Sequence, residues 1–181
     1  MLNAANLITL VRLALVPLMG WCVVSGRYAA AAAVFLIAAL SDLADGYIAR
    51  RFGMVSRLGG LLDPVADKLN MFVATLVLAS KDLVPVWLAA AIIARDVAIV
   101  AGVVAYRMRG KSLAMKPTWL SKFNTFVEFG VLALVFASAA GWVDIDRWLP
   151  LSFRIVLVTV IASAAHYAWL WKSGRLAMHR S

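Results

Sequence analysis

The chain has 181 residues, of which 64% are hydrophobic, and its formal net charge is +9. Its mean hydropathy is +0.90, and its apolar content lies far above the roughly 45–50% typical of soluble domains. These values argue against a soluble domain and predict a polytopic membrane protein. The basic charge suits anionic headgroups and anionic substrates, but the basic soluble face that nucleic-acid binding requires is missing.

Six apolar stretches follow one another, each near the ~20 residues that a helix needs to cross hydrocarbon. They cover 7–25, 28–49, 58–80, 83–107, 119–140 and 150–171. Turn-forming and charged residues separate them, among them Gly26, Gly53, Lys81 and Gly141. The sequence therefore predicts an all-α membrane protein with six transmembrane helices in a single domain over 1–181.

Basic residues are concentrated on the second and fourth connections and on the C-terminal tail. These residues are Arg50, Arg51, Arg57, Arg107, Arg109, Lys111, Lys116, Lys122, Lys172, Arg175 and Arg180. The other three connections carry only Arg27, Lys81 and Arg147. Since positive charge stays on the cytoplasmic side, both termini are predicted to be cytoplasmic. With no transit-like segment before the first apolar stretch, we expect a bacterial plasma (inner) membrane.

Four carboxylates interrupt the second and third apolar stretches. Asp42 and Asp45 are three residues apart, and Asp63 and Asp67 are four apart, so each pair shares one face of its helix. A short basic connection joins the two helices, which should run antiparallel and carry the pairs to similar depth near the cytoplasmic interface. Together the carboxylates would repel one another in hydrocarbon. Hard divalent cations such as Mg²⁺ or Mn²⁺ would remove that repulsion.

The same carboxylates also fit two roles that involve no catalysis. They could form structural ion pairs with Arg50, Arg57 or Lys68. They could also form the ion site of a small cation transporter, which predicts carboxylates near the bilayer midplane and discontinuous helices. Two residues that follow Asp45 suit an anionic ligand. Gly46 permits the close approach of a ligand, and the planar guanidinium of Arg50 matches phosphate.

The same segment resembles the CDP-alcohol phosphatidyltransferase family, whose pattern is D-x2-D-G-x2-A-R-x8-G-x3-D-x3-D. All eight fixed positions match, at Asp42, Asp45, Gly46, Ala49, Arg50, Gly59, Asp63 and Asp67. The resemblance implies a homodimer of six-helix chains with a two-metal site open to the cytoplasm. It assigns Asp42, Asp45 and Asp63 to two Mg²⁺ or Mn²⁺ ions. Asp67 would share a metal and act as general base on the acceptor hydroxyl.

The resemblance also implies a CDP-linked lipid, CDP-diacylglycerol, as donor. Its nucleotide pocket would be lined by Gly46, Ala49, Arg50 and Gly59. Thr9 and Arg12 are further candidates, because residues 6–12 resemble the family's common N-terminal segment. The acceptor oxygen would attack the phosphorus that bears the lipid, and CMP would leave.

Further similarity bears on the acceptor. Residues 62–68, 83–87, 93–97 and 117–125 resemble the CMP-forming cardiolipin synthases of eukaryotic type. Relatives that make phosphatidylglycerophosphate usually show G-K-x-K-T in the last of these segments, and Ser121 and Asn124 depart from it. This favours phosphatidylglycerol as acceptor and cardiolipin as product, with glycerol 3-phosphate as the alternative acceptor.

Basic residues are the candidates for binding the acceptor's phosphate, and they are Lys122, Arg107, Lys116 and Arg95. For Lys122, Arg107 and Lys116 the alternative is a charge that orients the chain, since basic residues near a membrane surface usually set topology. Lys122 is the first choice because the resemblance and the charge argument coincide there. Arg95 and Asp96 point about 100° apart on the fourth helix, so they need not pair with each other. For them an interhelical ion pair or hydrogen bond is the alternative.

Overall fold

The computed structural model describes residues 4–52, 59–108 and 118–173. Over these ranges the chain forms six α-helices and no strand, namely α1 (Ala4–Val24), α2 (Tyr28–Phe52), α3 (Gly59–Ala79), α4 (Val86–Met108), α5 (Trp119–Ala139) and α6 (Leu149–Lys172). Side chains are described at 11–41, 68–102, 104, 105, 108 and 118–173. The predicted all-α fold is confirmed, and each apolar stretch corresponds to one helix.

The chain divides into two compact units. The first unit comprises Met1–Val84 with Leu132–Asp146, and the second comprises Pro85–Val131 with Arg147–Ser181. Helix α5 therefore contributes its first part to the second unit and its last part to the first. The single domain predicted over the whole chain stays a prediction.

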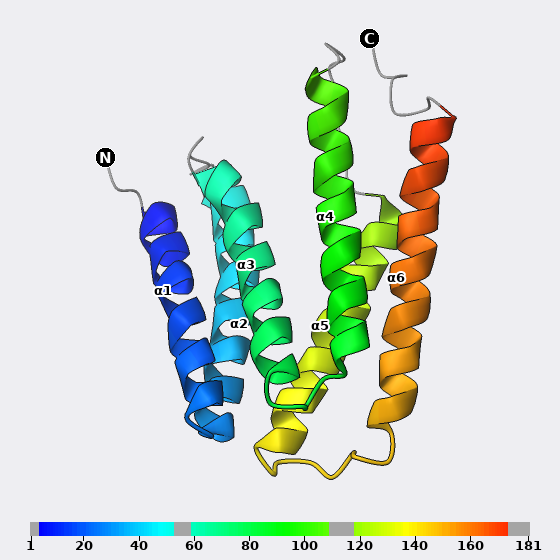
Figure 1. The fold of residues 1–181 in the computed structure, drawn as a ribbon. Helices are drawn as coiled ribbons and strands as arrows, with labels where there is room; N and C mark the ends of the chain where they lie inside the picture. The colour runs from blue at the N-terminus through cyan, green and yellow to red at the C-terminus, as the bar shows by residue number, and fades with distance from the viewer. Residues whose placement is uncertain (1–3, 53–58, 109–117, 174–181) are drawn as a thin grey trace. The chain divides into compact units, whose positions relative to one another are not determined.

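In the first unit, α1 packs against both α2 and α3 (Figure 1). The buried apolar side chains of the first unit include Met19, Val23, Phe35, Ala74, Leu78 and Phe136. The ring centroids of Phe35 and Phe136 lie 4.9 Å apart, within the range of favourable aromatic pairs. This contact joins the last part of α5 to α2 in the core of the unit.

Three helices end in the same kind of tight turn. Gly26 after α1, Asp82 after α3 and Gly141 after α5 have φ angles of 72°, 57° and 71°. At each turn two backbone N–H groups donate back into the last turn of the helix, as Arg27 does to the carbonyl of Cys22 at 2.8 Å. This is the Schellman arrangement. It reverses the chain between α1 and α2, which therefore run antiparallel.

In the second unit, α4 packs against α6. A Cβ atom on Gly102 of α4 would overlap the indole ring of Trp171 of α6. Glycine at this position therefore permits the close approach of the two helices, as small residues do in membrane helix pairs. The buried apolar side chains of α4 and α6 include Leu88, Ile92, Phe153, Val156 and Val160.

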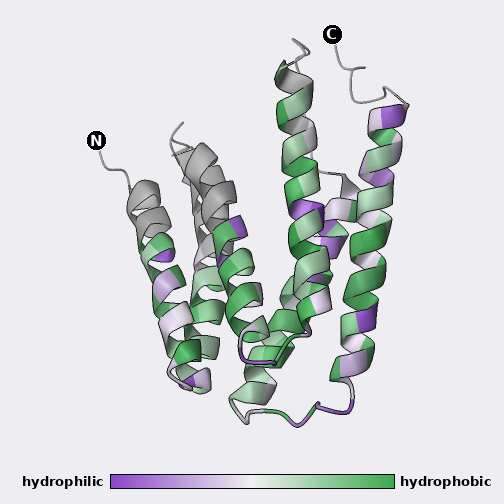
Figure 2. Ribbon diagram, in the orientation of Figure 1, coloured by the Kyte–Doolittle hydropathy of each residue, from purple (hydrophilic) through white to green (hydrophobic). Residues whose placement is uncertain are grey.

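Hydrophobic residues predominate along the described helices of both units (Figure 2). Large apolar side chains are exposed on helices of both units. Examples are Trp21, Ile37, Leu40, Val97, Phe126, Val158 and Ile161. By length and composition, α5 and α6 are each able to cross a membrane. In the described part of α1, α2 and α3 the apolar runs are shorter, at Val11–Val24, Tyr28–Ser41 and Lys68–Ala79. The six helices are thus confirmed, whereas six spans and the side of each terminus stay predictions.

Candidate functional site

The acidic residues lie on two helices that pack together. Asp42 and Asp45 are near the end of α2, and Asp63 and Asp67 are near the beginning of α3. The end of α2 and the beginning of α3 lie at the same end of the first unit (Figure 1). At about 1.5 Å per residue, Asp45 is about 10 Å from the end of α2, and Asp67 is about 12 Å from the start of α3. The helices therefore carry both acidic segments to similar depth.

Helix α1 carries a buried arginine, Arg12, at a depth similar to that of the acidic segments of α2 and α3. Arg12 lies about 12 Å along α1 from its first residue, at about 1.5 Å per residue. Since α1 runs antiparallel to α2, this depth is measured from the same end of the unit (Figure 1). Arg12 is only 2% exposed, and α1 contacts both α2 and α3. A buried guanidinium is stable only beside anionic or hydrogen-bonding groups. This end of the first unit therefore combines a buried cation with the acidic segments.

Most of the predicted site residues have side chains outside the described part of the structure. They are Asp42, Asp45, Asp63, Asp67, Gly46, Ala49, Arg50, Gly59, Thr9 and Arg107, whereas Lys116 lies outside the described residues altogether. Among the side chains that are described, no three His, Cys, Asp or Glu residues are grouped as a metal site. The metal and nucleotide assignments therefore stay predictions.

The chemistry of the acidic segments fits hard divalent ions. Four aspartates supply only oxygen donors, which Mg²⁺ and Mn²⁺ prefer over nitrogen or sulfur. Both α2 and α3 continue without interruption through their acidic positions. A transporter site built on broken helices would require interruptions there, so the backbone gives that alternative no support.

The second unit contains a polar network around Arg95 of α4. Its Nη1 donates to Asp96 Oδ1 at 2.7 Å, and its Nη2 donates to Ser121 Oγ of α5 at 2.7 Å and to Ser163 Oγ of α6 at 2.6 Å. Arg95 is 6% exposed and Ser163 is wholly buried. The long arginine side chain thus reaches its neighbour Asp96 despite the different directions of their Cα–Cβ bonds. Arg95 therefore makes interhelical hydrogen bonds, and its assignment to the acceptor stays a prediction.

Sequence reasoning missed a buried polar pair on α5. Asn124 Nδ2 donates to Glu128 Oε2 at 3.3 Å, and the two residues are 0% and 6% exposed. Asn124 Oδ1 has no hydrogen-bond partner within the described part of the chain. The available signal was the four-residue spacing of two polar residues inside an apolar stretch, where such residues usually face a partner or a cavity. Lys122, between Ser121 and this pair, is exposed.

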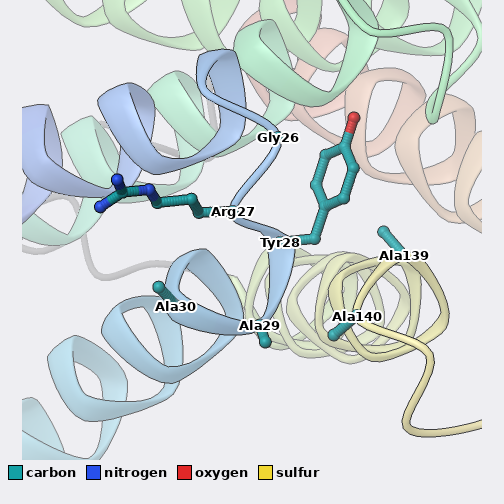
Figure 3. A pocket seen from close by; sticks show the side chains of 7 residues that line it. All are labelled: Gly26, Arg27, Tyr28, Ala29, Ala30, Ala139 and Ala140. Atoms are coloured by element: carbon teal, nitrogen blue, oxygen red, sulfur yellow. The ribbon is translucent and has the colours of Figure 1, made fainter.

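A cavity of about 450 Å³ lies at the opposite end of the first unit, where α1 turns into α2 and α5 ends (Figure 3). It is lined by Gly26, Arg27, Tyr28, Ala29, Ala30, Ala139 and Ala140. The Arg27 guanidinium carbon lies 5.0 Å from the ring centre of Trp21. Tyr28 and Asp45 are separated by about 25 Å along α2, at 1.5 Å per residue. This cavity is therefore distinct from the acidic segments.

Comparison with known proteins identifies the family. The sequence model of CDP-alcohol phosphatidyltransferases matches residues 2–169. The chain is 38% identical to the cardiolipin synthase (CMP-forming)/mitochondrial hydrolase fusion protein of Schizosaccharomyces pombe, over 90% of this chain and 30% of that protein. It is 33% identical to the cardiolipin synthase (CMP-forming) of Homo sapiens, over 90% of this chain and 59% of that protein. The chain belongs to the CDP-alcohol phosphatidyltransferase family.

A third relative carries a different name. The CDP-diacylglycerol–glycerol-3-phosphate 3-phosphatidyltransferase of Bacillus subtilis is 30% identical, over 86% of this chain and 91% of that protein. The chain thus spans less than two thirds of the yeast and human proteins but nearly all of the Bacillus one. The names of the relatives differ: two are called cardiolipin synthases, and the third is called a glycerol-3-phosphate 3-phosphatidyltransferase.

Replacing Arg12 by Met tests whether the buried cation is paired within the first unit. Removing one partner of a buried ion pair costs about 3–5 kcal/mol, and we expect a loss of that size in the free energy of unfolding of metal-free protein. Reversible denaturation in detergent micelles would measure it.

The matched control is R27M, which removes an exposed arginine beyond the other end of α1. Since Arg27 stacks on Trp21, R27M should cost no more than about 1 kcal/mol. A loss for R12M as small as that for R27M would contradict a paired, buried charge at Arg12.

Proposed function

We propose that the protein is a membrane-embedded transferase of phospholipid biosynthesis. It would move a phosphatidyl group from CDP-diacylglycerol to the hydroxyl of phosphatidylglycerol, giving cardiolipin and CMP. The observation that carries the proposal is the complete eight-position pattern on α2 and α3, which place its acidic residues at a shared end of the first unit. Family membership supports the reaction class, and the names of the yeast and human relatives support the product.

In this proposal the aspartates have two roles, which are metal binding and proton abstraction. Asp42, Asp45 and Asp63, with Asp67, would hold two Mg²⁺ or Mn²⁺ ions, which when bound offset the charge on the attacking and leaving oxygens. Asp67 takes the proton of the acceptor hydroxyl. The acceptor oxygen forms a bond to the phosphorus that bears diacylglycerol, the bond from that phosphorus to CMP breaks, and CMP leaves with the electron pair.

Two further groups of residues bind the substrates in this proposal. The CDP-lipid is bound by Gly46, Ala49, Arg50, Gly59, Thr9 and Arg12. The burial of Arg12 near the depth of the acidic segments supports its inclusion, because a guanidinium in that environment attracts phosphate. Lys122, which is exposed in the first turn of α5, is the main candidate for the acceptor's phosphate, with Arg107 and Lys116 adding positive charge.

We also propose that all six helices span a bacterial plasma membrane, with both termini and the site on the cytoplasmic side, and that two chains form a homodimer. The exposed apolar side chains and the membrane-length helices α5 and α6 support insertion. The basic residues on the second and fourth connections support the orientation.

Glycerol 3-phosphate is the second candidate acceptor. The Bacillus subtilis relative favours it, since its name specifies that acceptor and the chain spans 91% of its length. Ser121 and Asn124, which depart from the pattern of phosphatidylglycerophosphate-forming relatives, favour phosphatidylglycerol.

The function is tested by supplying purified protein with CDP-diacylglycerol, Mg²⁺ or Mn²⁺, and one acceptor at a time. Phosphatidylglycerol, glycerol 3-phosphate, inositol phosphate and serine would be compared, with the lipid product identified by mass spectrometry. We expect cardiolipin and one CMP per lipid formed, both abolished by a chelator. Absence of CMP with every acceptor would reject the transferase, and phosphatidylglycerophosphate as sole product would select the second candidate.

Substitution of single aspartates separates the base from the metal ligands. We expect D67N to lower turnover by about 10²–10⁴-fold, the usual contribution of a general base, while CDP-diacylglycerol still binds. D42N should weaken metal and nucleotide binding together, as titration calorimetry would show. D82N is the control, because Asp82 is exposed in the turn after α3 and asparagine tolerates its positive φ.

Two outcomes would contradict these roles. If D67N lost binding and turnover in equal measure, Asp67 would be chiefly a ligand. If metal titration of D42N matched that of D82N, Asp42 would not be a ligand.

A further inference from the structure

We infer that Arg95 is a positioning residue that fixes the first turn of α5, and with it Lys122, and does not itself bind the acceptor. This inference depends on the proposed function for the identity of the two substrates. It starts from the hydrogen bonds of the guanidinium, two of which leave α4 for two different helices.

Two of the three guanidinium nitrogens of Arg95 donate within the protein, whereas the buried Nε has no partner among the described residues. Nη2 is shared between Ser121 on α5 and Ser163 on α6, and Nη1 is taken by Asp96. The planar guanidinium holds several acceptors in fixed directions at once, which a single ammonium group cannot do. Because Ser163 is wholly buried and Arg95 nearly so, the bond between them is shielded from water and strengthened accordingly. The bonds to Ser121 and Asp96 are only partly buried.

The first turn of α5 is held at two points through one residue. The backbone N–H of Ser121 donates to Thr118 Oγ1 at 3.2 Å, which is the N-cap bond of α5. The hydroxyl of the same Ser121 accepts from Arg95. Lys122 is the next residue, and its N–H donates to the carbonyl of Thr118 at 3.1 Å. The position of the Lys122 backbone therefore follows from the two contacts of Ser121.

Arg95 and Ser163 belong to two helices, α4 and α6, that pack closely together. Gly102 lies two turns after Arg95 on α4, and its lack of a side chain admits the ring of Trp171 of α6. Helices α4 and α6 pack together, and Ser163 connects this pair to Arg95. Loss of the Arg95 bonds should therefore loosen the first turn of α5 more than it disturbs α4 and α6.

This arrangement predicts a selective kinetic defect. The residues proposed for CDP-lipid binding lie on α1, α2 and α3 of the first unit, whereas Lys122 follows Ser121 directly. Loosening the first turn of α5 should weaken acceptor binding, with little effect on the CDP-lipid. A residue that supports only global stability would change both KM values or the amount of folded protein.

The test compares R95Q, the double variant S121A/S163A and the triple combination in detergent or nanodiscs. We expect each to raise KM for phosphatidylglycerol by about 5–20-fold, with KM for CDP-diacylglycerol within about twofold of wild type. The triple variant should match R95Q, because groups that act as one unit are not additive. Hydrogen exchange of residues 119–125 should be at least about tenfold faster in each variant.

The matched control is S152A in the first turn of α6, whose hydroxyl donates to the carbonyl of the N-cap residue Trp148 at 3.1 Å and to no other helix among the described residues. It should leave both KM values and the exchange of α5 unchanged. If R95Q fails to fold, S121A alone supplies the same comparison with a milder change, because it removes only the bond from Arg95 to α5.

Three results would overturn the inference. If R95Q raises the acceptor KM further on the S121A/S163A background, Arg95 binds the acceptor directly. Equal changes in both KM values would indicate a merely structural role. Unchanged exchange in the first turn of α5 would show that Arg95 does not fix it. Hydrogen exchange can be measured without turnover. An inactive wild-type protein would therefore reject the proposed function, while the exchange of residues 119–125 would still test whether Arg95 fixes the first turn of α5.

Discussion

A charged group inside an apolar helix bundle is stable only beside an opposite charge, a set of hydrogen-bond partners or a bound ion, and this requirement organises the polar residues of the protein. Arg12 and Arg95 are almost fully buried. Around Arg95 the compensation is visible, since an aspartate and two serine hydroxyls accept from its guanidinium. The same requirement applied to the acidic segments of α2 and α3 leads to the proposed pair of divalent ions.

The residues proposed for the two substrates belong to different units of the chain. Every residue proposed for the metals and the CDP-lipid belongs to the first unit, where the Gly26 turn makes α1 and α2 antiparallel and α3 begins at the end where α2 stops. Every acceptor candidate belongs to the second unit, on α4, on the start of α5 or on the connection before it. Acceptor choice could therefore change through residues of the second unit while the CDP-lipid chemistry stays constant.

The helices were predictable from the sequence because apolar stretches bounded by glycine, proline and charge leave few alternatives. Glycine in the sequence indicates the turns at Gly26 and Gly141. The left-handed conformation of Asp82 carries no such signal, because this residue is not glycine. The polar network was only partly predictable. Ser163 is an ordinary small residue in a helix sequence, and its role follows from the close approach of α4 and α6. The only signal for the Asn124–Glu128 pair in the sequence was the four-residue spacing of two polar residues inside an apolar stretch.

The family pattern itself could be read from the sequence in full, because it depends on residue type and spacing alone. The depth of its acidic segments follows from the helix bounds, but the convergence of four side chains on a pair of ions does not.

The most direct test of that convergence is electron paramagnetic resonance of purified protein titrated with Mn²⁺. The account predicts two Mn²⁺ per chain with the exchange coupling of ions about 3.5–4 Å apart, and loss of the coupled signal in D45N. A single uncoupled ion, or coupling unchanged in D45N, would contradict it.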